Sequence, residues 1–310
     1  MNNYIYDVII IGGGPSGLTA AFYAGRAKLN TLLFSGKPGG GELFLAIIIE
    51  DFPGFPNGIS GFELLNLMTE QAKKFNTQII NKDIIKVDFS SKPYKVYDED
   101  NNEYQAKGII IATGGKPRWL GLEKEKEFIG KGISVCAICD GAFFQGKIVA
   151  VVGGGDVALE DAVYLTQYAN KVYLIHRRNE FKASKFWQEQ VFKNPKIEII
   201  FNSEVQKLIG ETKLEGIIIK NNQNNTETEL KVDGLFLAIG FDPNSDIFKG
   251  QLEIDDHGYI KTIDNVKTSK EGVYAAGDVS DFKYRQVITA SGFGAMAGIE
   301  IEKWLRTLND

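Results

Sequence analysis

The sequence predicts an α/β protein that contains two strand–helix–strand units. A glycine-rich turn follows a short apolar run near the N-terminus, and the same arrangement returns about halfway along the chain. A helical pattern and a second apolar run follow each of these turns. The length of 310 residues agrees with two domains, because single hydrophobic cores stop growing at roughly 250–300 residues.

The first unit is YDVIIIGGGPSGLTAAFYAGRAKLNTLLFSG, in which residues 8–11 and NTLLF are expected to form buried strands. Gly12, Gly14 and Gly17 give the spacing GxGxxG, which lets the backbone approach a pyrophosphate at a helix N-terminus. This predicts a Rossmann-like dinucleotide-binding domain; a glycine turn in an ordinary α/β sheet is the alternative. The second strand ends in FSG, without the acidic residue that binds a ribose hydroxyl. The helix is expected to direct four side chains toward the sheet: Leu18, Ala21, Phe22 and Ala24.

The second unit is GKIVAVVGGGDVALEDAVYLTQYANKVYLIHRR. Residues 148–152 and KVYLI are expected to form strands, and residues 156–168 a helix. Gly153, Gly155 and Ala158 give the related spacing GxGxxA. Cations after the second strand suit a 2′-phosphate, so NADP is expected in preference to NAD, with a solvated basic edge as the alternative. These basic residues are His176, Arg177, Arg178 and Lys182.

Two dinucleotide sites in one chain predict two cofactors, most economically a bound flavin dinucleotide and a diffusible nicotinamide. A third segment supports the flavin. Residues 273–276 are expected to form a strand that ends at Gly277 and Asp278, and a helix is expected from about Gln286. Asp278 can hold ribityl hydroxyls, and the helix start can offer N–H groups to the flavin ring. In the alternative interpretation, this strand and helix only close the sheet.

The only two cysteines, Cys136 and Cys139, lie in the sequence CAICDG and are followed directly by Asp140. A structural zinc ion needs four ligands, and the chain offers only these two cysteines and two histidines, so no metal is expected. An inert buried pair is the second alternative. Redox chemistry is favoured, because a CxxC pair lowers a cysteine pKa and in a cytosolic chain often forms a redox motif.

Composition and charge exclude several classes of protein function and location. The net charge of −5 lacks the basic footprint of nucleic-acid binding. The N-terminus has no basic start followed by an apolar core, so no secretory signal is expected. No apolar run approaches the ~20 residues that a membrane span needs. We therefore expect a cytoplasmic protein without a nucleic-acid or membrane partner, with residues 221–229 as a polar hairpin tip or loop.

Taken together, the motifs resemble those of bacterial-type, low-molecular-weight thioredoxin reductases over nearly the whole chain. They are GGGPSGLTAA, PGG with EDFPGFP, ATGGKPR, CAICDG, GGGDVALEDA, HRRNEFKASK, AIGFDPN, AAGDV and YRQVITASG, in the order and spacing of that family. The resemblance implies an NADPH-dependent thioredoxin-disulfide reductase that binds FAD, forms a homodimer and reduces thioredoxin. It also implies a discontinuous FAD domain, residues 1–116 and 246–310, with an NADPH domain that carries the CxxC, residues 117–245, inserted into it.

The resemblance further assigns roles to individual residues. Cys139 would face the flavin, Cys136 would attack the substrate disulfide, and Asp140 would protonate the leaving thiolate, with helix capping as its alternative role. The inserted domain would rotate between two poses about Gly114–Gly115 and Gly240. The expected NADPH site comprises Gly153, Gly155, Asp156, Val157, Ala158, Glu160, His176, Arg177, Arg178, Lys182, Ile239 and Gly240. The expected FAD site comprises Gly12, Gly14, Pro15, Ser16, Gly17, Ser35, Gly36, Gly40, Gly41, Glu42, Leu43, Asp51, Ala112, Thr113, Gly114, Gly277, Asp278, Arg285, Gln286, Val287 and Ala290.

The chain departs from the family pattern at several of these positions. Glu42 replaces a glutamine, FLAIII replaces a threonine-rich run, and Asp51 replaces an asparagine. Acidic residues there are expected to lower the flavin potential or weaken FAD retention. Lys182 replaces a third arginine and keeps the charge without the bidentate fork, so the preference for NADPH is expected to survive with a smaller margin. A carboxylate at Asp156 disfavours a pyrophosphate unless it faces away.

Three rival functions remain open at this stage. The first is an enzyme of the same fold with another partner, such as a peroxidase-linked flavoprotein or a dithiol oxidase. A peroxidase-linked flavoprotein usually carries an extra N-terminal region, whereas this chain starts at the first fingerprint. A dithiol oxidase usually lacks a good NADPH site, whereas this chain has the motifs of one. The second is a ferredoxin-driven reductase, for which eroded NADPH motifs are expected. The third is a redox-sensing flavoprotein, marked by slow turnover and by partner binding in one redox state.

Overall fold

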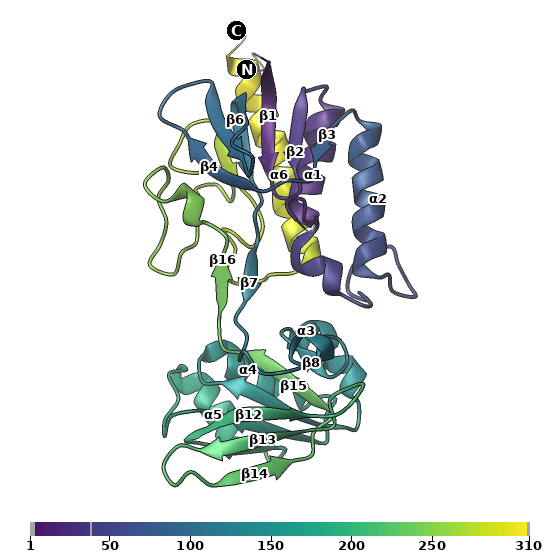
Figure 1. Cartoon of the computed structure of the whole chain (residues 1–310), viewed down its shortest axis with the longest axis vertical. Coiled ribbons are helices and arrows are strands. Elements are labelled where there is room, and N and C mark those ends of the chain that lie inside the picture. The colour runs from purple at the N-terminus through teal and green to yellow at the C-terminus, as the bar shows by residue number, and fades with distance from the viewer. Residues whose placement is uncertain (1–3, 38, 309–310) are drawn as a thin grey trace. The chain divides into compact units, whose positions relative to one another are not determined.

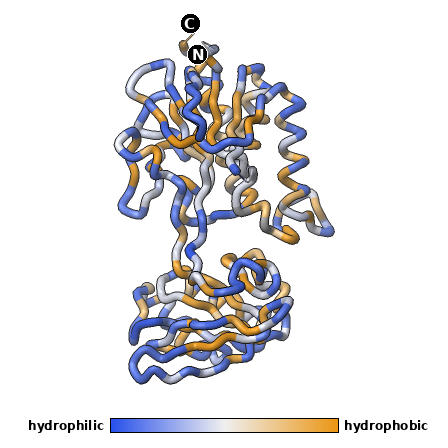
Figure 2. Tube along the Cα trace, in the orientation of Figure 1, coloured by the Kyte–Doolittle hydropathy of each residue, from blue (hydrophilic) through white to orange (hydrophobic). Residues whose placement is uncertain are grey.

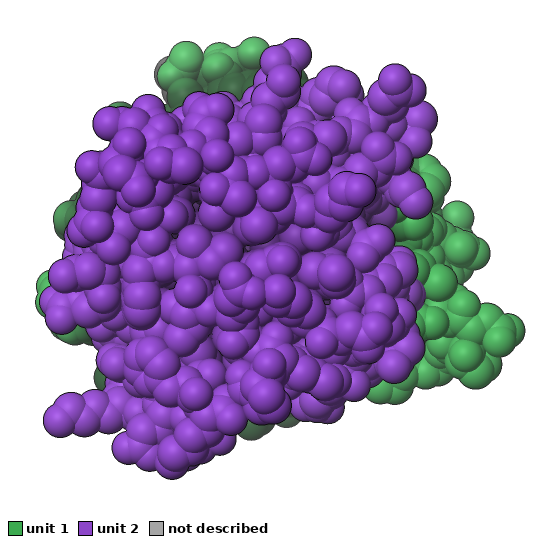
Figure 3. Space-filling model, turned by 90° about the horizontal axis from the view of Figure 1, so that it is seen from below, with its two compact units in different colours: residues 1–116, 242–310 green, residues 117–241 purple. Residues whose placement is uncertain are grey.

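The computed structural model describes residues 4–37 and 39–308 (Figure 1). The chain forms two compact units, which Figure 3 distinguishes by colour. Unit 1 comprises Met1–Lys116 and Asp242–Asp310, and unit 2 comprises Pro117–Phe241. Unit 2 is therefore inserted into unit 1, and the chain returns to unit 1 at residue 242 rather than at the expected residue 246.

Unit 1 is built on a sheet in which β6 is the longest strand. The order is β3-β2-β1-β6-β5-β4, and β17 also pairs with β6. The first half of β6 pairs antiparallel with β5, whereas its second half pairs in parallel with β17. The parallel strands are β1 (Ile5–Ile11), β2 (Thr31–Phe34), β3 (Gln78–Ile80), β6 (Glu103–Ile111) and β17 (Val273–Ala275). The antiparallel strands are β4 (Ile84–Asp88) and β5 (Tyr94–Asp98).

Three helices accompany this sheet: α1 (Pro15–Arg26), α2 (Gly61–Lys74) and α6 (Val287–Thr307). Leu18, Ala21 and Ala24 are buried, as the sequence predicts. Phe22 is only half-buried, and its ring contacts Phe75 at a centroid distance of 5.4 Å instead of lying in the core. Unit 1 also contains the short 3₁₀ segments η1 (Gly41–Leu45) and η4 (Asp246–Phe248).

Unit 2 contains a five-stranded parallel sheet in the order β11-β10-β9-β15-β8. These strands are β8 (Ile133–Ser134), β9 (Ile148–Gly153), β10 (Lys171–Ile175), β11 (Ile197–Ile200) and β15 (Gly234–Ala238). An antiparallel sheet contains β12 (Ser203–Ile209), β13 (Gly216–Asn221) and β14 (Glu227–Leu230). The helices and 3₁₀ segments are α3 (Ala137–Asp140), α4 (Asp156–Leu165), α5 (Lys185–Lys193), η2 (Lys126–Phe128) and η3 (Gly141–Phe144).

Where the chain crosses between the units, β7 (Gly115–Pro117) and β16 (Phe241–Pro243) form a two-stranded sheet. Thr113 and Asn244 also join these crossings, because the Thr113 hydroxyl donates to the Asn244 carbonyl at 2.7 Å. The Asn244 amide group in turn donates to the Thr113 carbonyl at 3.0 Å.

The strands expected from apolar runs are confirmed, and apolar colour follows the central strands of both units in Figure 2. Residues 221–229 form the expected hairpin tip, because β13 ends at Asn221 and β14 begins at Glu227. The helix expected over residues 156–168 is shorter, since α4 ends at Leu165 and residues 166–168 form a turn.

Candidate active site

The first fingerprint turn packs so tightly that it requires glycine. Gly12 has a φ of 118°, and a Cβ there would lie 2.0 Å from the Ala112 carbonyl oxygen at the end of β6. A Cβ on Gly17 would lie 1.9 Å from the Gly12 oxygen. Gly14 precedes α1 as its N-cap and Pro15 is its first residue, so the helix N-terminus begins directly at the turn. Its unpaired N–H groups suit a pyrophosphate.

Three segments of the expected FAD site meet at this turn. A Cβ at Gly277 would lie 3.0 Å from Ser16 Cβ and 3.6 Å from Ala290 Cβ. The turn, the end of β17 and the start of α6 are therefore adjacent. Close packing of α1 on α6 adds to this, because a Cβ at Gly294 would lie 2.1 Å from the Ser16 carbonyl oxygen.

Two polar groups at this junction fit a bound FAD. The Ser16 hydroxyl is buried and has no hydrogen-bond partner within residues 4–37 and 39–308. Burial, with repulsion from Asp281, raises the pKa of Asp278 to about 6, while Arg285 opposes the shift. A desolvated carboxyl and an unsatisfied hydroxyl are the groups that ligand hydroxyls and phosphate oxygens would satisfy.

Hydrogen bonds from residues at and just before the N-terminus of α6 fix the start of this helix. Gln286 is the N-cap and forms a capping box with Thr289, so its side-chain oxygen already accepts the Thr289 N–H. Arg285 adopts a left-handed φ of 48°, and its N–H donates to the Asp281 carboxylate at 3.4 Å. Val287 is the first residue of the helix.

A carboxylate that the sequence analysis missed lies beside the end of β2. The Ser35 hydroxyl donates to Asn81 Oδ1 at 2.7 Å. Asp83 Oδ1 accepts the Lys37 N–H at 3.2 Å and would lie 3.1 Å from a Cβ on Gly36. The segment between β3 and β4 therefore places a carboxylate beside the end of β2, where FSG itself has none. Only the strand order, which places β3 beside β2, brings it there.

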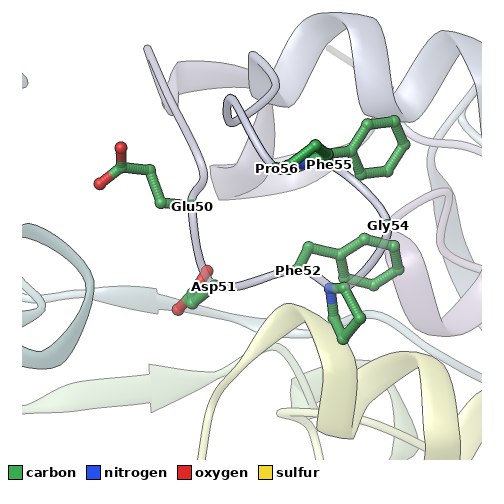
Figure 4. A pocket seen from close by; sticks show the side chains of 7 residues that line it. Glu50, Asp51, Phe52, Gly54, Phe55 and Pro56 are labelled. Atoms are coloured by element: carbon green, nitrogen blue, oxygen red, sulfur yellow. The ribbon is translucent and has the colours of Figure 1, made fainter.

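The segment after β2 turns through Gly40 and Gly41, both with positive φ, into η1. Leu43 is half-buried, and the side chain of Glu42 lies outside the described part of the structure. Asp51 is exposed in a pocket of unit 1 that residues 50–56 line. Glu50 and Asp51 lie at one end of this loop, and the rings of Phe52 and Phe55 lie at the other (Figure 4).

The second fingerprint is tied to the segment before α5. The Lys182 and Ala183 N–H groups both donate to the Gly154 carbonyl, at 2.8 and 3.2 Å. Asp156 Oδ1 accepts the Ser184 N–H at 2.6 Å, so its carboxylate is engaged at the start of α5. Gly155 has open space where a Cβ would be, which leaves room for a ligand.

The remaining residues of this site surround the same turn. Ala158 is buried against Gly153, whereas Val157 and Glu160 are exposed on α4. Ile239 and Gly240 follow β15, whose last residue pairs with Gly153.

The basic cluster divides into two parts. Arg177, Arg178 and Lys182 are exposed, as a phosphate site requires. His176 is buried against Phe181, and a Cβ on Gly154 would lie 2.2 Å from its ring. Burial, assisted by the neighbouring arginines, lowers the pKa of His176, so the imidazole is neutral at neutral pH. The expectation that His176 adds positive charge to this site is therefore not supported.

Cys136 and Cys139 form a disulfide, with their Cα atoms 5.4 Å apart. Cys136 is the N-cap of α3, and its Sγ accepts the Cys139 N–H at 3.1 Å. Cys136 is half-buried and Cys139 is exposed. Ser134, a residue that no sequence motif marks as functional, donates from its buried hydroxyl to Asp140 Oδ2 at 2.6 Å.

The described ranges contain neither a candidate metal site nor a candidate membrane span. No group of three or more histidine, cysteine, aspartate or glutamate side chains there could hold a metal ion. None of the described helices combines the length and the apolar character that crossing a membrane requires.

Residues 6–294 match the model of the pyridine nucleotide-disulphide oxidoreductase family. The chain belongs to this family, whose members use FAD and NADPH, and is a flavoprotein oxidoreductase. Among curated relatives, it is 46% identical over 302 residues to thioredoxin reductase of Rickettsia typhi, covering 96% of this chain and 97% of the relative. It is 43% identical over 308 residues to thioredoxin reductase of Streptomyces clavuligerus, covering 99% and 96%.

Solved structures that resemble this chain also include thioredoxin reductases. Thioredoxin reductase from Giardia duodenalis superposes with a TM-score of 0.93 at 40% identity, covering 98% of this chain and all of that chain. Thioredoxin reductase from Streptococcus pyogenes gives a TM-score of 0.94 at 39% identity, covering 99% and 100%. The predicted α/β fold with two dinucleotide-binding domains and the predicted family resemblance are confirmed.

Proposed function

We propose that this protein is an NADPH-dependent reductase of thioredoxin disulfide. The observation that carries the proposal is the Cys136–Cys139 disulfide, which shares unit 2 with a nucleotide fingerprint and two exposed arginines. Unit 1 would serve as the FAD domain and unit 2 as the NADPH domain. FAD, when bound, supplies the link between a two-electron hydride donor and a dithiol.

Unit 1 would hold FAD through groups that face the first fingerprint turn. The N–H groups at the start of α1 and the Ser16 hydroxyl would bind the pyrophosphate, and Asp278 would accept from ribityl hydroxyls. Asp83, which lies beside Gly36, would accept hydrogen bonds from ribose hydroxyls. The other FAD residues assigned from the sequence would complete the site.

Unit 2 would bind NADPH at the second turn. Arg177 and Arg178 would hold the 2′-phosphate and the start of α4 the pyrophosphate. Asp156 would oppose this binding less than a free carboxylate, because its Oδ1 accepts the Ser184 N–H at 2.6 Å. Lys182 is exposed and would add positive charge to the phosphate site, while its backbone N–H donates to the Gly154 carbonyl in the turn.

The two cysteines would take different parts in thiol–disulfide exchange. When the disulfide is reduced, the Cys139 N–H that now contacts Cys136 Sγ would stabilise a thiolate there. Cys136 would attack the substrate disulfide, and Cys139 would then resolve the mixed disulfide. Asp140, next to Cys139 in α3, would supply the proton for the leaving thiolate.

The wider arrangement is also a proposal. Access of both the nicotinamide and the dithiol to one flavin would require unit 2 to turn about the crossings near Gly114–Gly115 and Gly240. Gly114 and Gly240 both adopt positive φ, and the crossings pair as two short strands with further hydrogen bonds between Thr113 and Asn244. Similarity to the named relatives supports thioredoxin as the substrate. A homodimer and a cytoplasmic location are proposed on the family resemblance.

Trapping the mixed disulfide tests the assignment of the two cysteines. A thioredoxin with its second cysteine changed to serine is activated at its first cysteine as an aromatic mixed disulfide. The Cys139→Ser enzyme should form a covalent one-to-one adduct with it through Cys136, and the Cys136→Ser enzyme should not. Adduct formation only by Cys136→Ser would exchange the two roles, and no adduct with either variant would argue against thioredoxin as partner.

A further inference from the structure

Ser134 occupies a connecting position between the sheet of unit 2 and the dithiol turn. It ends β8, where it pairs with Phe236 of β15, and its side chain is only 7% exposed. Its hydroxyl oxygen lies 2.6 Å from Asp140 Oδ2 and 3.3 Å from the Cys136 carbonyl oxygen. It also accepts the Cys136 N–H at 3.0 Å. One buried hydroxyl thus contacts both the proposed nucleophile's backbone and the proposed acid.

These contacts allow two hydrogen-bond arrangements with the same heavy-atom positions. When Asp140 is ionised, the Ser134 hydroxyl donates to its carboxylate. When Asp140 is protonated, the carboxyl O–H donates to Ser134, and the Ser134 hydroxyl turns to the Cys136 carbonyl. That carbonyl also accepts the Asp140 N–H at 3.2 Å, and its two lone pairs serve both bonds.

We propose that Ser134 is a positioning residue that holds Asp140 in both protonation states during disulfide exchange, an inference that rests on the proposed function. Because one hydroxyl can both donate and accept, Asp140 need not move or lose a hydrogen bond when its proton leaves. The bond from Cys136 N to Ser134 keeps the hydroxyl in place in either state.

The proton balance over one turnover shows why Asp140 must be both protonated and ionised in turn. The Cys136 thiol gives its proton to Asp140, and the resulting thiolate attacks a substrate sulfur. The Cys136–substrate bond forms, the substrate S–S bond breaks, and the leaving sulfur keeps the electron pair and takes the proton from Asp140. Cys139 then gives its proton to Asp140 and attacks Cys136 sulfur. The enzyme disulfide reforms, and the second substrate sulfur leaves with its electron pair and that proton, so Asp140 cycles twice.

Other titratable groups pack near this turn from α4 and from the turn after it, which contains Tyr168. Tyr164 and Tyr168 line Gly141, each at 3.3 Å from where its Cβ would be, and their hydroxyls lie 3.3 Å apart. Asp161 is on the same helix, which packs against α3. These groups are unchanged in the variants below, so their charges are the same in every comparison.

Single-turnover kinetics of the holoenzyme, reduced beforehand with NADPH, test the proposal. Ser134→Ala should slow reoxidation by thioredoxin disulfide on the order of tenfold, a part of the roughly 10²–10⁴-fold that general acid–base catalysis typically contributes. Ser134→Thr keeps the hydroxyl on a strand residue and should restore most of the rate. Ser203→Ala is the matched control, because Ser203 is a buried serine of unit 2 whose hydroxyl donates to the Phe201 carbonyl. Its rate should equal that of the wild type.

Two further readouts separate positioning from a purely structural role. In an Asp140→Asn background, Ser134→Ala should cause little additional loss, because the two residues act as a unit. Small disulfides give the second readout: Ser134→Ala should slow reaction with an aliphatic disulfide more than reaction with an aromatic one, because both need Asp140 to take the cysteine protons but the aromatic thiolate leaves without a proton. Reduction of the flavin by NADPH should be unaffected.

The outcomes distinguish this inference from the proposed function. Wild-type rates for Ser134→Ala, or equal slowing with aliphatic and aromatic disulfides, would overturn the role of Ser134. Additive losses with Asp140→Asn would likewise assign Ser134 to folding alone. If the wild type reacts with small disulfides but not with thioredoxin, the proposed partner is wrong, while the Ser134 comparison is still decided by the small disulfides.

Discussion

Asp278 provides the sharpest quantitative prediction, because its carboxyl is desolvated within unit 1. Its pKa is raised from 3.8 to about 6, first by burial and then by the charge of Asp281. Each tenfold change in proton affinity is worth about 1.4 kcal/mol, so ionising this group in the folded apo-protein costs about 3 kcal/mol more than in the unfolded chain. A raised folded-state pKa contributes stability below the unfolded pKa, and that stability is lost as pH rises through the folded pKa.

The Asp278→Asn substitution removes this titration while keeping the side-chain shape. The measured quantity is the free energy of unfolding of the apo-variant minus that of apo-wild type. This difference should rise by about 3 kcal/mol in favour of the variant as the pH is raised from about 4 to about 7. Urea unfolding of apo-protein measures it, with Trp119 and Trp187 changed to phenylalanine so that Trp304 reports on unit 1 alone. The same substitution should weaken FAD retention, because an amide accepts hydrogen bonds more weakly than a carboxylate.

A difference between Asp278→Asn and wild type that does not vary with pH would refute this reasoning. Asp281→Asn is the matched control, because it removes a neighbouring charge but leaves Asp278 to titrate. It should reduce the pH dependence without abolishing it, since burial rather than Asp281 is the larger cause. Tighter FAD binding by Asp278→Asn would contradict the placement of this residue in the FAD site.

Three further predictions concern unit 2. Replacing Arg177 and Arg178 with alanine should raise KM for NADPH at least tenfold and leave KM for NADH nearly unchanged, because hydrogen bonds to charged groups are worth about 1.5–3 kcal/mol. Equal increases of both KM values in steady-state assays would contradict the assignment of these arginines to the 2′-phosphate. Gly154→Ala would place its Cβ 2.2 Å from His176, so nicotinamide binding and the Tm of unit 2 should fall while FAD content is kept; an unchanged melting curve would show that the ring can move away. The lowered pKa of His176 means that the unfolded state binds more protons, so the stability of unit 2 should fall as pH drops below about 6.5, and urea titrations of His176→Gln should lack this component.

The sequence predicts best those features whose causes are local. The turns at Gly12 and Gly153, the strands before them and the helices after them follow from residues that are neighbours in the chain. The cysteine spacing likewise predicts a pair that is close enough to bond.

Features that depend on tertiary contacts were missed or predicted differently. Asp83 reaches the end of β2 only because β3 pairs with β2. Ser134 meets Asp140 only because the chain turns back through α3 after β8. His176 belongs by sequence to a basic cluster, but its ring packs beneath the fingerprint turn and its pKa is lowered. Sequence spacing does not show which side of a loop faces the core.

Anaerobic oxidation of NADPH by the purified holoenzyme with oxidised thioredoxin tests the central claim most directly. NADH and the Cys139→Ser variant serve as controls. We predict rapid loss of NADPH that depends on thioredoxin, is much slower with NADH, and is abolished by the substitution. If NADPH reduces the flavin but thioredoxin does not reoxidise the enzyme, the proposed partner is wrong. If NADPH does not reduce the flavin, the role of Arg177 and Arg178 fails, and another electron donor must be sought.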